Sequence, residues 1–306
     1  MWAYTLRRLL ATLPTLLAVI TATYLLVHAA PGGPFDSERV VSEAVLANLN
    51  AKYHLDLPPW QQYLHYLNNL LHGDLGASFR YADWSVNDLV AAALPVSLSI
   101  GGISMAVSFF LGVGLGIVAA LRQNSAADYG VMLLGNLGSV VPSFVIGPVL
   151  VLVFALWLGW LPAGGWDAFA PRFMVLPIAL LTFINVATIA RVMRGSLIEV
   201  LHSNFIRTAR AKGLPTRVVV LRHALRPALL PVVSVLGPLA ISSITAALVT
   251  ETVFSLPGLG KLIVHGAGNR DYTLVLGLVV LITVLAVLLN LLVDLAYAAL
   301  DPKIRY

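Results

Sequence analysis

The sequence contains no cysteine, and only 11% of its 306 residues are Asp, Glu, Lys or Arg. The absence of cysteine excludes disulfides, zinc thiolates and cysteine nucleophiles. A soluble protein carries about 25% charged residues, so a chain this poor in charge cannot cover a globular surface with groups that water solvates. Together with a hydrophobic content of 59%, this predicts lipid as the solvent of most of the chain.

Motifs of several enzyme classes are also missing. The chain has no Gly-x-x-x-x-Gly-Lys-Ser/Thr loop, so it does not bind ATP in the manner of P-loop proteins. It has neither a His-x-x-x-His pair nor a Gly-x-Ser-x-Gly elbow, and we predict no catalytic residue and no metal site. An intramembrane hydrolase therefore lacks a supporting motif. A stand-alone secondary peptide carrier stays open, although such carriers usually have more ionisable groups in their spans.

Long uncharged windows mark the membrane spans. A helix needs about 20 residues to cross the hydrocarbon core, so each window predicts one crossing, and the longest has room for a helix plus a loop. The windows are 9–35, 89–121, 129–166, 173–190, 227–250 and 272–293. We therefore predict an all-α polytopic membrane protein with six transmembrane helices, the first of which (1–30) is too long to be a signal-peptide core.

The distribution of basic residues predicts the orientation. With six spans both termini lie on one face of the membrane. That face receives 13 Lys and Arg residues and the opposite face receives six. Because basic residues accumulate on the cytoplasmic side, both termini, including the tail 299–306, are predicted to be cytoplasmic.

The segment 31–94 is the only large piece outside the spans, and we expect a small helical periplasmic insertion. Ser42–Lys52 and Pro59–Leu71 both have the pattern of helices, and Gly73 is a stop signal after the second. The insertion could be a cap packed on the membrane helices, or a lip that touches an external partner or the entering solute.

The loop 191–226 holds eight of the 19 basic residues and a single acid, Glu199. Ser203 and Asn204 are good N-cap residues, and Gly213 suits the left-handed position after a helix end. These signals predict a short helix over 203–213, with Phe205, Ile206 and Ala209 on one face. We interpret the loop as a docking element, the alternative being a basic loop that only fixes topology.

Two features inside the spans need an interpretation. The run Gly112-x-Gly114-x-Gly116 has no strand before it and predicts close helix packing rather than a nucleotide site. Glu251, near the end of the fifth span, is an intramembrane acid and so a functional candidate. It could contact a cationic solute group or a neighbouring arginine.

Several blocks of the chain resemble the membrane subunit of bacterial ATP-binding-cassette importers for oligopeptides, dipeptides and nickel, most of all the B-type oligopeptide branch. The blocks are Tyr53-His54-Leu55 through Gly73-Asp74-Leu75-Gly76 and Ser78-Phe79, then Glu199–Pro231, Glu251–Gly260, Asn269-Arg270-Asp271-Tyr272 and Asp301-Pro302-Lys303-Ile304-Arg305. The resemblance covers nearly the whole chain. It implies an importer core over 95–298 in the bacterial inner membrane.

In such importers the cytoplasmic loop carries a coupling helix that contacts an ATPase subunit. The resemblance implies this role for Asn204, Phe205, Arg207, Thr208, Ala209, Arg210, Ala211, Lys212 and Gly213. Arg207 stands where the general motif has Glu, so individual salt bridges of other branches are not carried over.

The resemblance also implies partners: a homologous second permease, two ATP-binding subunits and a periplasmic peptide-binding protein. ATP and Mg would be held by those partner subunits, with no cofactor on this chain and no role for nucleic acid. The solute path would run between the two permeases and be lined by the few polar groups of the spans. Candidates are Asn136, Ser139, Ser143, Asn185, Thr188, Ser242, Ser243, Thr245 and Glu251. Each of the uncharged ones could instead make an interhelical hydrogen bond.

Overall fold

The computed structural model describes residues 2–29, 55–81 and 83–300. These residues form helices, with one isolated antiparallel bridge between Ala77 and Ser85. In the described part, five helices are long and apolar enough to cross a membrane, and a bent helix pair makes the number six if it counts as one span. The prediction of an all-α polytopic membrane protein is confirmed.

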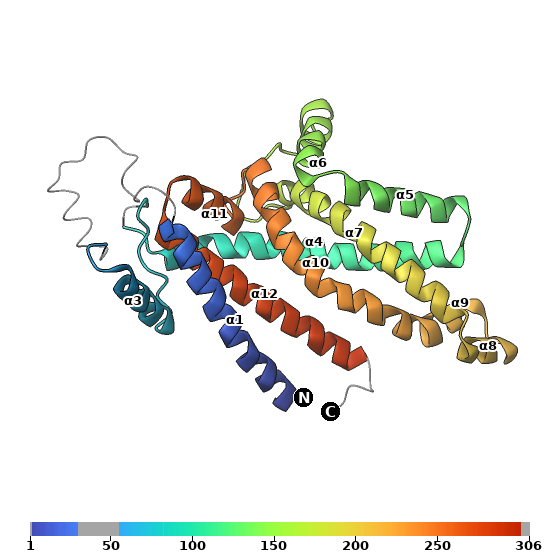
Figure 1. The fold of residues 1–306 in the computed structure, drawn as a ribbon. Coiled ribbons are helices and arrows are strands. Elements are labelled where there is room, and N and C mark those ends of the chain that lie inside the picture. The colour runs from blue at the N-terminus through green and yellow to red at the C-terminus, as the bar shows by residue number, and fades with distance from the viewer. Residues whose placement is uncertain (1, 30–54, 82, 301–306) are drawn as a thin grey trace.

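The spans run roughly side by side (Figure 1). Single long helices form α1 (Trp2–Ala29), α4 (Val86–Leu121), α7 (Pro171–Leu201) and α12 (Tyr272–Leu300). The remaining long span begins as α9 (Thr216–Val218), continues through the π-helical segment η2 (Val219–Ala224) and becomes α10 (Leu225–Val253). Helices α3 (Pro59–Leu71) and α11 (Leu259–Gly268) lie at one end of the bundle, and α8 (Asn204–Ala211) lies at the other. We call these the α3 end and the α8 end.

The third window contains a break rather than one straight crossing. Helix α5 (Ala126–Val140) and the unit formed by α6 (Ser143–Leu150) and η1 (Val151–Trp157) meet at an angle of 108°. The break lies at Val141, which has an extended backbone (φ −82°, ψ 122°) because the ring of Pro142 disfavours a helical conformation in the residue before it. Pro142 then begins α6 as its N-cap.

Helices α4 and α7 approach each other closely along small residues. A Cβ atom added to Gly112 would lie 2.6 Å from the side chain of Ile189, and one added to Gly116 would lie 2.7 Å from the carbonyl oxygen of Ala190. Gly114 faces open space. The prediction that these glycines serve helix packing is confirmed for two of the three.

Some predicted boundaries need correction. Residues 191–201 are the last three turns of α7, and residues from 216 onward are helical again, so the loop predicted over 191–226 is confined to 202–215 around α8. Likewise, α4 begins at Val86, inside the predicted insertion 31–94. Both shifts arise because the ends of the long helices contain charged residues. An uncharged window stops at the first charge, so it is shorter than the helix.

At the α3 end, a helix over Pro59–Leu71 is confirmed, while the helix predicted over Ser42–Lys52 lies outside the described residues. Asp271 ties the segment after α3 to the start of α12. Its buried carboxylate accepts hydrogen bonds from the Ser78 hydroxyl and from the backbone N–H groups of Phe79 and Leu274, both at 3.2 Å. Two blocks of the sequence, 73–79 and 269–272, therefore form one structural unit.

Candidate functional site

Helix α8 rests on the ends of the spans through two residues. Ile206 and Ala209, three positions apart, are buried in an apolar cluster that also contains Leu197 of α7 and Val219 of η2. A helix of eight residues is marginal in water, so this apolar contact is what holds it in place. A displacement of α8 therefore acts directly on both α7 and the span that begins at α9.

The ends of α8 follow the local signals in the sequence. Ser203 is the N-cap residue by position, although its hydroxyl donates to the carbonyl oxygen of Val200 rather than capping the helix. At the other end, Gly213 has φ +75°, and its N–H donates to the Arg210 carbonyl at 2.9 Å. The left-handed stop predicted at Gly213 is confirmed.

Phe205 is placed differently from the prediction. We expected it to share a face with Ile206 and Ala209, but its side chain is 51% exposed. Adjacent helix positions lie about 100° apart, so with Ile206 directed into the apolar cluster, Phe205 points away from it. The exposed residues of the predicted coupling set are Asn204, Phe205, Arg207, Thr208, Arg210, Ala211, Lys212 and Gly213, and only Ala209 is buried. The outward surface of α8 is thus basic, with one large apolar side chain.

The residues predicted for the path fall into three groups. Asn185 and Ser243 are buried, and the Asn185 amide donates to Ser243 Oγ at 2.9 Å, which is an interhelical bond between α7 and α10. Ser143 and Thr188 are half-buried, while Asn136, Ser139 and Ser242 are exposed on the surface of this chain. The side chain of Thr245 lies outside the described part.

Arg191 joins this set and was missed from the sequence, where it was assigned to the cytoplasmic loop. Its Nη2 donates to Asn136 Oδ1 at 3.1 Å and to Ser139 Oγ at 3.4 Å, bringing α7 and α5 together at an exposed polar cluster. A signal was available: no proline separates Arg191 from Leu201, and an isolated glycine such as Gly195 is tolerated in a helix, so the helical pattern of the span continues past the arginine.

The carboxylate of Glu251 is engaged inside the chain. The side chain is 1% exposed; Ser97 Oγ of α4 donates to Oε1 at 2.5 Å, and the N–H groups of Gly260 and Lys261 donate to Oε2 at 2.6 and 3.2 Å. The last two belong to the first turn of α11, whose free N–H groups and positive dipole end favour a carboxylate. A Cβ atom added to Gly258 would lie 2.3 Å from this carboxyl group. This placement favours a role in joining α4, α10 and α11 over lining the path.

Another buried carboxylate lies toward the α8 end. Asp128, 2% exposed in the first turn of α5, accepts from Arg194 Nε at 2.5 Å and from Arg194 Nη2 at 2.7 Å. The backbone N–H of Asn124 donates to the same carboxylate at 2.9 Å. This bidentate pair fixes the start of α5 against α7, one turn from Arg191.

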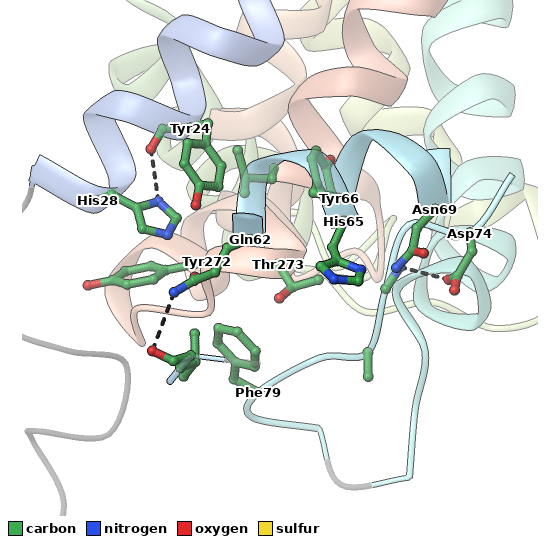
Figure 2. Close-up of a pocket in the computed structure, with 14 residues that line it drawn as sticks. Tyr24, His28, Gln62, His65, Tyr66, Asn69, Asp74, Phe79, Tyr272 and Thr273 are labelled. Atoms are coloured by element: carbon green, nitrogen blue, oxygen red, sulfur yellow. Dashed lines mark hydrogen bonds between the residues drawn. The ribbon is translucent and has the colours of Figure 1, made fainter. Parts of the chain in front are cut away.

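A cavity of about 230 Å³ lies at the α3 end, between the end of α1, α3 and the start of α12. Figure 2 shows its mixed lining, with Tyr24, Tyr66 and Tyr272 among amide and imidazole groups. His28 stacks on Tyr24, with ring centroids 3.9 Å apart, and its Nδ1 donates to the Tyr24 carbonyl at 2.9 Å. Burial raises the pKa of Tyr66 well above its usual range. These contacts give His28 a structural role.

In the described part of the chain, no group of three or more His, Asp or Glu residues is arranged to hold a metal ion. The absence of a metal and of a cofactor stays a prediction.

Comparisons of the sequence with protein families and with individual proteins all find bacterial transport proteins. The family model described as "Binding-protein-dependent transport system inner membrane component" matches residues 112–306. The chain is 55% identical over 306 residues to the oligopeptide transport system permease protein OppB of Haemophilus influenzae, covering 100% of both proteins. It is 53% identical to OppB of Escherichia coli K12 over the same full length, and 41% identical over 302 residues to the dipeptide transport system permease protein DppB of Bacillus subtilis, covering 99% of this chain and 97% of that protein.

Among solved structures, the chain resembles one from the MetNI methionine ABC transporter in an inward-facing conformation. The TM-score is 0.60 at 20% sequence identity, and the match covers 70% of this chain and 96% of the other. At this identity the likeness concerns the fold alone.

Proposed function

The chain belongs to the family of inner membrane components of binding-protein-dependent transport systems, and on that premise we propose that it carries oligopeptides from the periplasm to the cytoplasm. It is the permease subunit of an ABC importer and is located in the inner membrane. The observation that carries the choice of solute is the full-length likeness to oligopeptide permeases of two organisms. Dipeptides or nickel are the alternative cargo within the same family.

The complete importer, in this proposal, contains a second homologous permease, two ATP-binding subunits and a periplasmic peptide-binding protein. ATP and Mg are held by the ATP-binding subunits, and both termini of this chain are cytoplasmic. The outward surface of α8 supports this arrangement, because a basic helix with an exposed Phe205 suits an acidic groove on a partner protein.

Alternating access follows from how α8 is held. Nucleotide-driven closure of the ATPase subunits moves α8, and the buried Ile206 transmits that movement to α7 and to the span beginning at α9. The spans then exchange outward-open and inward-open states. ATP drives this cycle only if it stabilises one of these states more than the other.

Reconstitution tests the proposal. Proteoliposomes with the complete importer are expected to accumulate a labelled oligopeptide only with ATP inside. Vesicles with this chain alone, under an imposed proton gradient, are expected to accumulate none. Uptake by the isolated chain would contradict the proposal and support a stand-alone secondary carrier.

We expect Phe205→Ala to weaken retention of the ATPase subunits by about tenfold in a detergent pull-down, because exposed aromatic side chains dominate many interfaces. Thermal stability of the permease itself is expected to stay unchanged, since the ring is half exposed. Leu133→Ala on α5, where the side chain is 61% exposed, is the matched control and should retain the ATPase subunits. Equal retention of the ATPase subunits by both variants would show that Phe205 does not contribute to the interface.

Gly213→Val is expected to abolish most of the ATP-dependent uptake while the chain still inserts in the membrane. A left-handed backbone costs a residue with a side chain about 1–2 kcal/mol, and β-branching adds to this cost. No atom lies within 4 Å of an added Cβ, so the backbone alone is responsible. Gly213→Asn, which tolerates this conformation, is the control and should transport at close to the wild-type rate; normal coupling in the valine variant would argue against α8 as the docking helix.

A further inference from the structure

Arg191, Asn136 and Ser139 form an exposed polar cluster that joins α7 to α5 and leaves donors of the arginine unused. We infer that it is a carboxylate-binding station in the solute path, where the guanidinium of Arg191 binds the terminal carboxylate of a peptide in transit. This inference rests on the proposed function, since it names the chemical group of the cargo that one site recognises.

The guanidinium retains unused donors and an uncompensated charge. Its Nη2 donates to two neutral oxygens, Asn136 Oδ1 and Ser139 Oγ. In the described part of the chain no carboxylate pairs with Arg191, whereas Arg194, one turn away, forms a bidentate pair with Asp128. The N–H groups on Nε and Nη1 have no partner among the described residues. Arginine binds a carboxylate through two parallel N–H bonds, and these donors are the ones that such a contact needs.

The cluster lies away from the α8 end of the bundle. Helix α5 starts at the α8 end, and Asn136 is ten residues along it. At 1.5 Å per residue this is about 15 Å from the start of α5. Arg191 is likewise ten residues before the end of α7 at Leu201.

The direction of the side chain argues against contact with lipid. An arginine that faces hydrocarbon extends its head toward the nearer water layer, which here is the α8 end. The guanidinium instead reaches Ser139, which lies 13 residues along α5 and thus farther from that end than Asn136. Two hydrogen bonds hold the charge away from the α8 end, and beside an apolar surface this is favourable only in contact with water, protein or an anion.

The α5 surface around the cluster is otherwise apolar. On α5, Leu133, Leu137 and Val140 share the face of Asn136 at helical spacing, and all of them are exposed in this chain. A single fixed cation on an apolar wall gives weak, reversible attraction to a passing anion. Every unmodified peptide carries one terminal carboxylate whatever its sequence, so this contact suits a carrier of varied peptides.

The test is equilibrium binding of peptides to the purified permease–ATPase complex. The periplasmic binding protein is left out, because its own selectivity would otherwise contribute to the result. The probes are penta-alanine and its C-terminal amide, which differ only in the carboxylate. We expect the wild-type complex to bind the free acid at least about tenfold more tightly than the amide, as a charged hydrogen-bonded pair would give. Arg191→Gln is expected to bind both peptides at the level of the amide.

Two variants sharpen the result. Arg191→Lys keeps the charge but loses the planar fork, and should discriminate between the two peptides to an intermediate degree. Arg172→Gln removes an exposed arginine from the other end of the same helix, and should behave as wild type.

Three outcomes would overturn the inference. The first is equal binding of the acid and the amide by the wild-type complex, which includes no detectable binding of either. The second is an equal loss of affinity for both peptides in Arg191→Gln. The third is loss of the second permease from the Arg191→Gln complex. The last would make Arg191 a contact between subunits. None of these outcomes affects the proposed function, which stands or falls on ATP-dependent uptake by the complete wild-type importer.

Discussion

Glu251→Ala is expected to destabilise the permease by at least about 3 kcal/mol, because three donors lose their acceptor in a buried environment. The Ser97 hydroxyl and the N–H groups of Gly260 and Lys261 would all be left without the carboxylate. Since these groups belong to α4 and α11, the variant should loosen the whole α3 end. The measurement is the midpoint of thermal unfolding in detergent, followed by the monodispersity of the heated protein.

Two comparisons isolate the role of the carboxylate. Glu251→Gln keeps one oxygen acceptor for the first turn of α11, so its loss of stability should be smaller than that of the alanine variant. Thr252→Val alters the next residue, which is exposed and donates only to Leu248 of its own helix, and should be neutral. If Glu251→Ala melted at the wild-type temperature but failed to transport, the carboxylate would belong to the path after all.

Much of the architecture could be predicted from the sequence because lipid imposes a simple rule on composition. Uncharged windows mark the spans, and local chemistry marks helix ends: Pro59 begins α3, and Gly213, at φ +75°, follows α8. These features depend on neighbours within a few residues. They are therefore visible in the chain without knowledge of the packing.

The features that could not be predicted all depend on distant partners. Arg191 and Arg194 were assigned to a loop because a charge usually marks an interface, yet Asn136 and Asp128 accommodate them within the bundle. Glu251 was interpreted as a functional candidate because no partner for it is visible nearby in the sequence; its partner Ser97 is 154 residues away. Pro142 marks where the third window breaks, but it does not set the 108° angle between the two halves.

Arg194→Met should be among the most destabilising substitutions in this chain, with a loss of about 3–5 kcal/mol. The substitution leaves Asp128, which is 2% exposed, as a buried charge without its bidentate partner. The start of α5 would then separate from α7 close to the helix ends that support α8. We expect a lower thermal midpoint and, at permissive temperature, a larger loss of ATP-dependent uptake than of membrane insertion.

The same helix provides the matched control. Arg172 pairs with Asp167 at 3.7 Å, but both side chains are more than 60% exposed, so Arg172→Met should cost no more than about 0.5 kcal/mol. The double variant Asp128→Asn with Arg194→Met removes the unpaired charge, and should recover part of the stability that Arg194→Met loses. If the double variant were no more stable than the single one, lost packing around the arginine stem would explain the effect, and the ion pair would not be what holds α5 to α7.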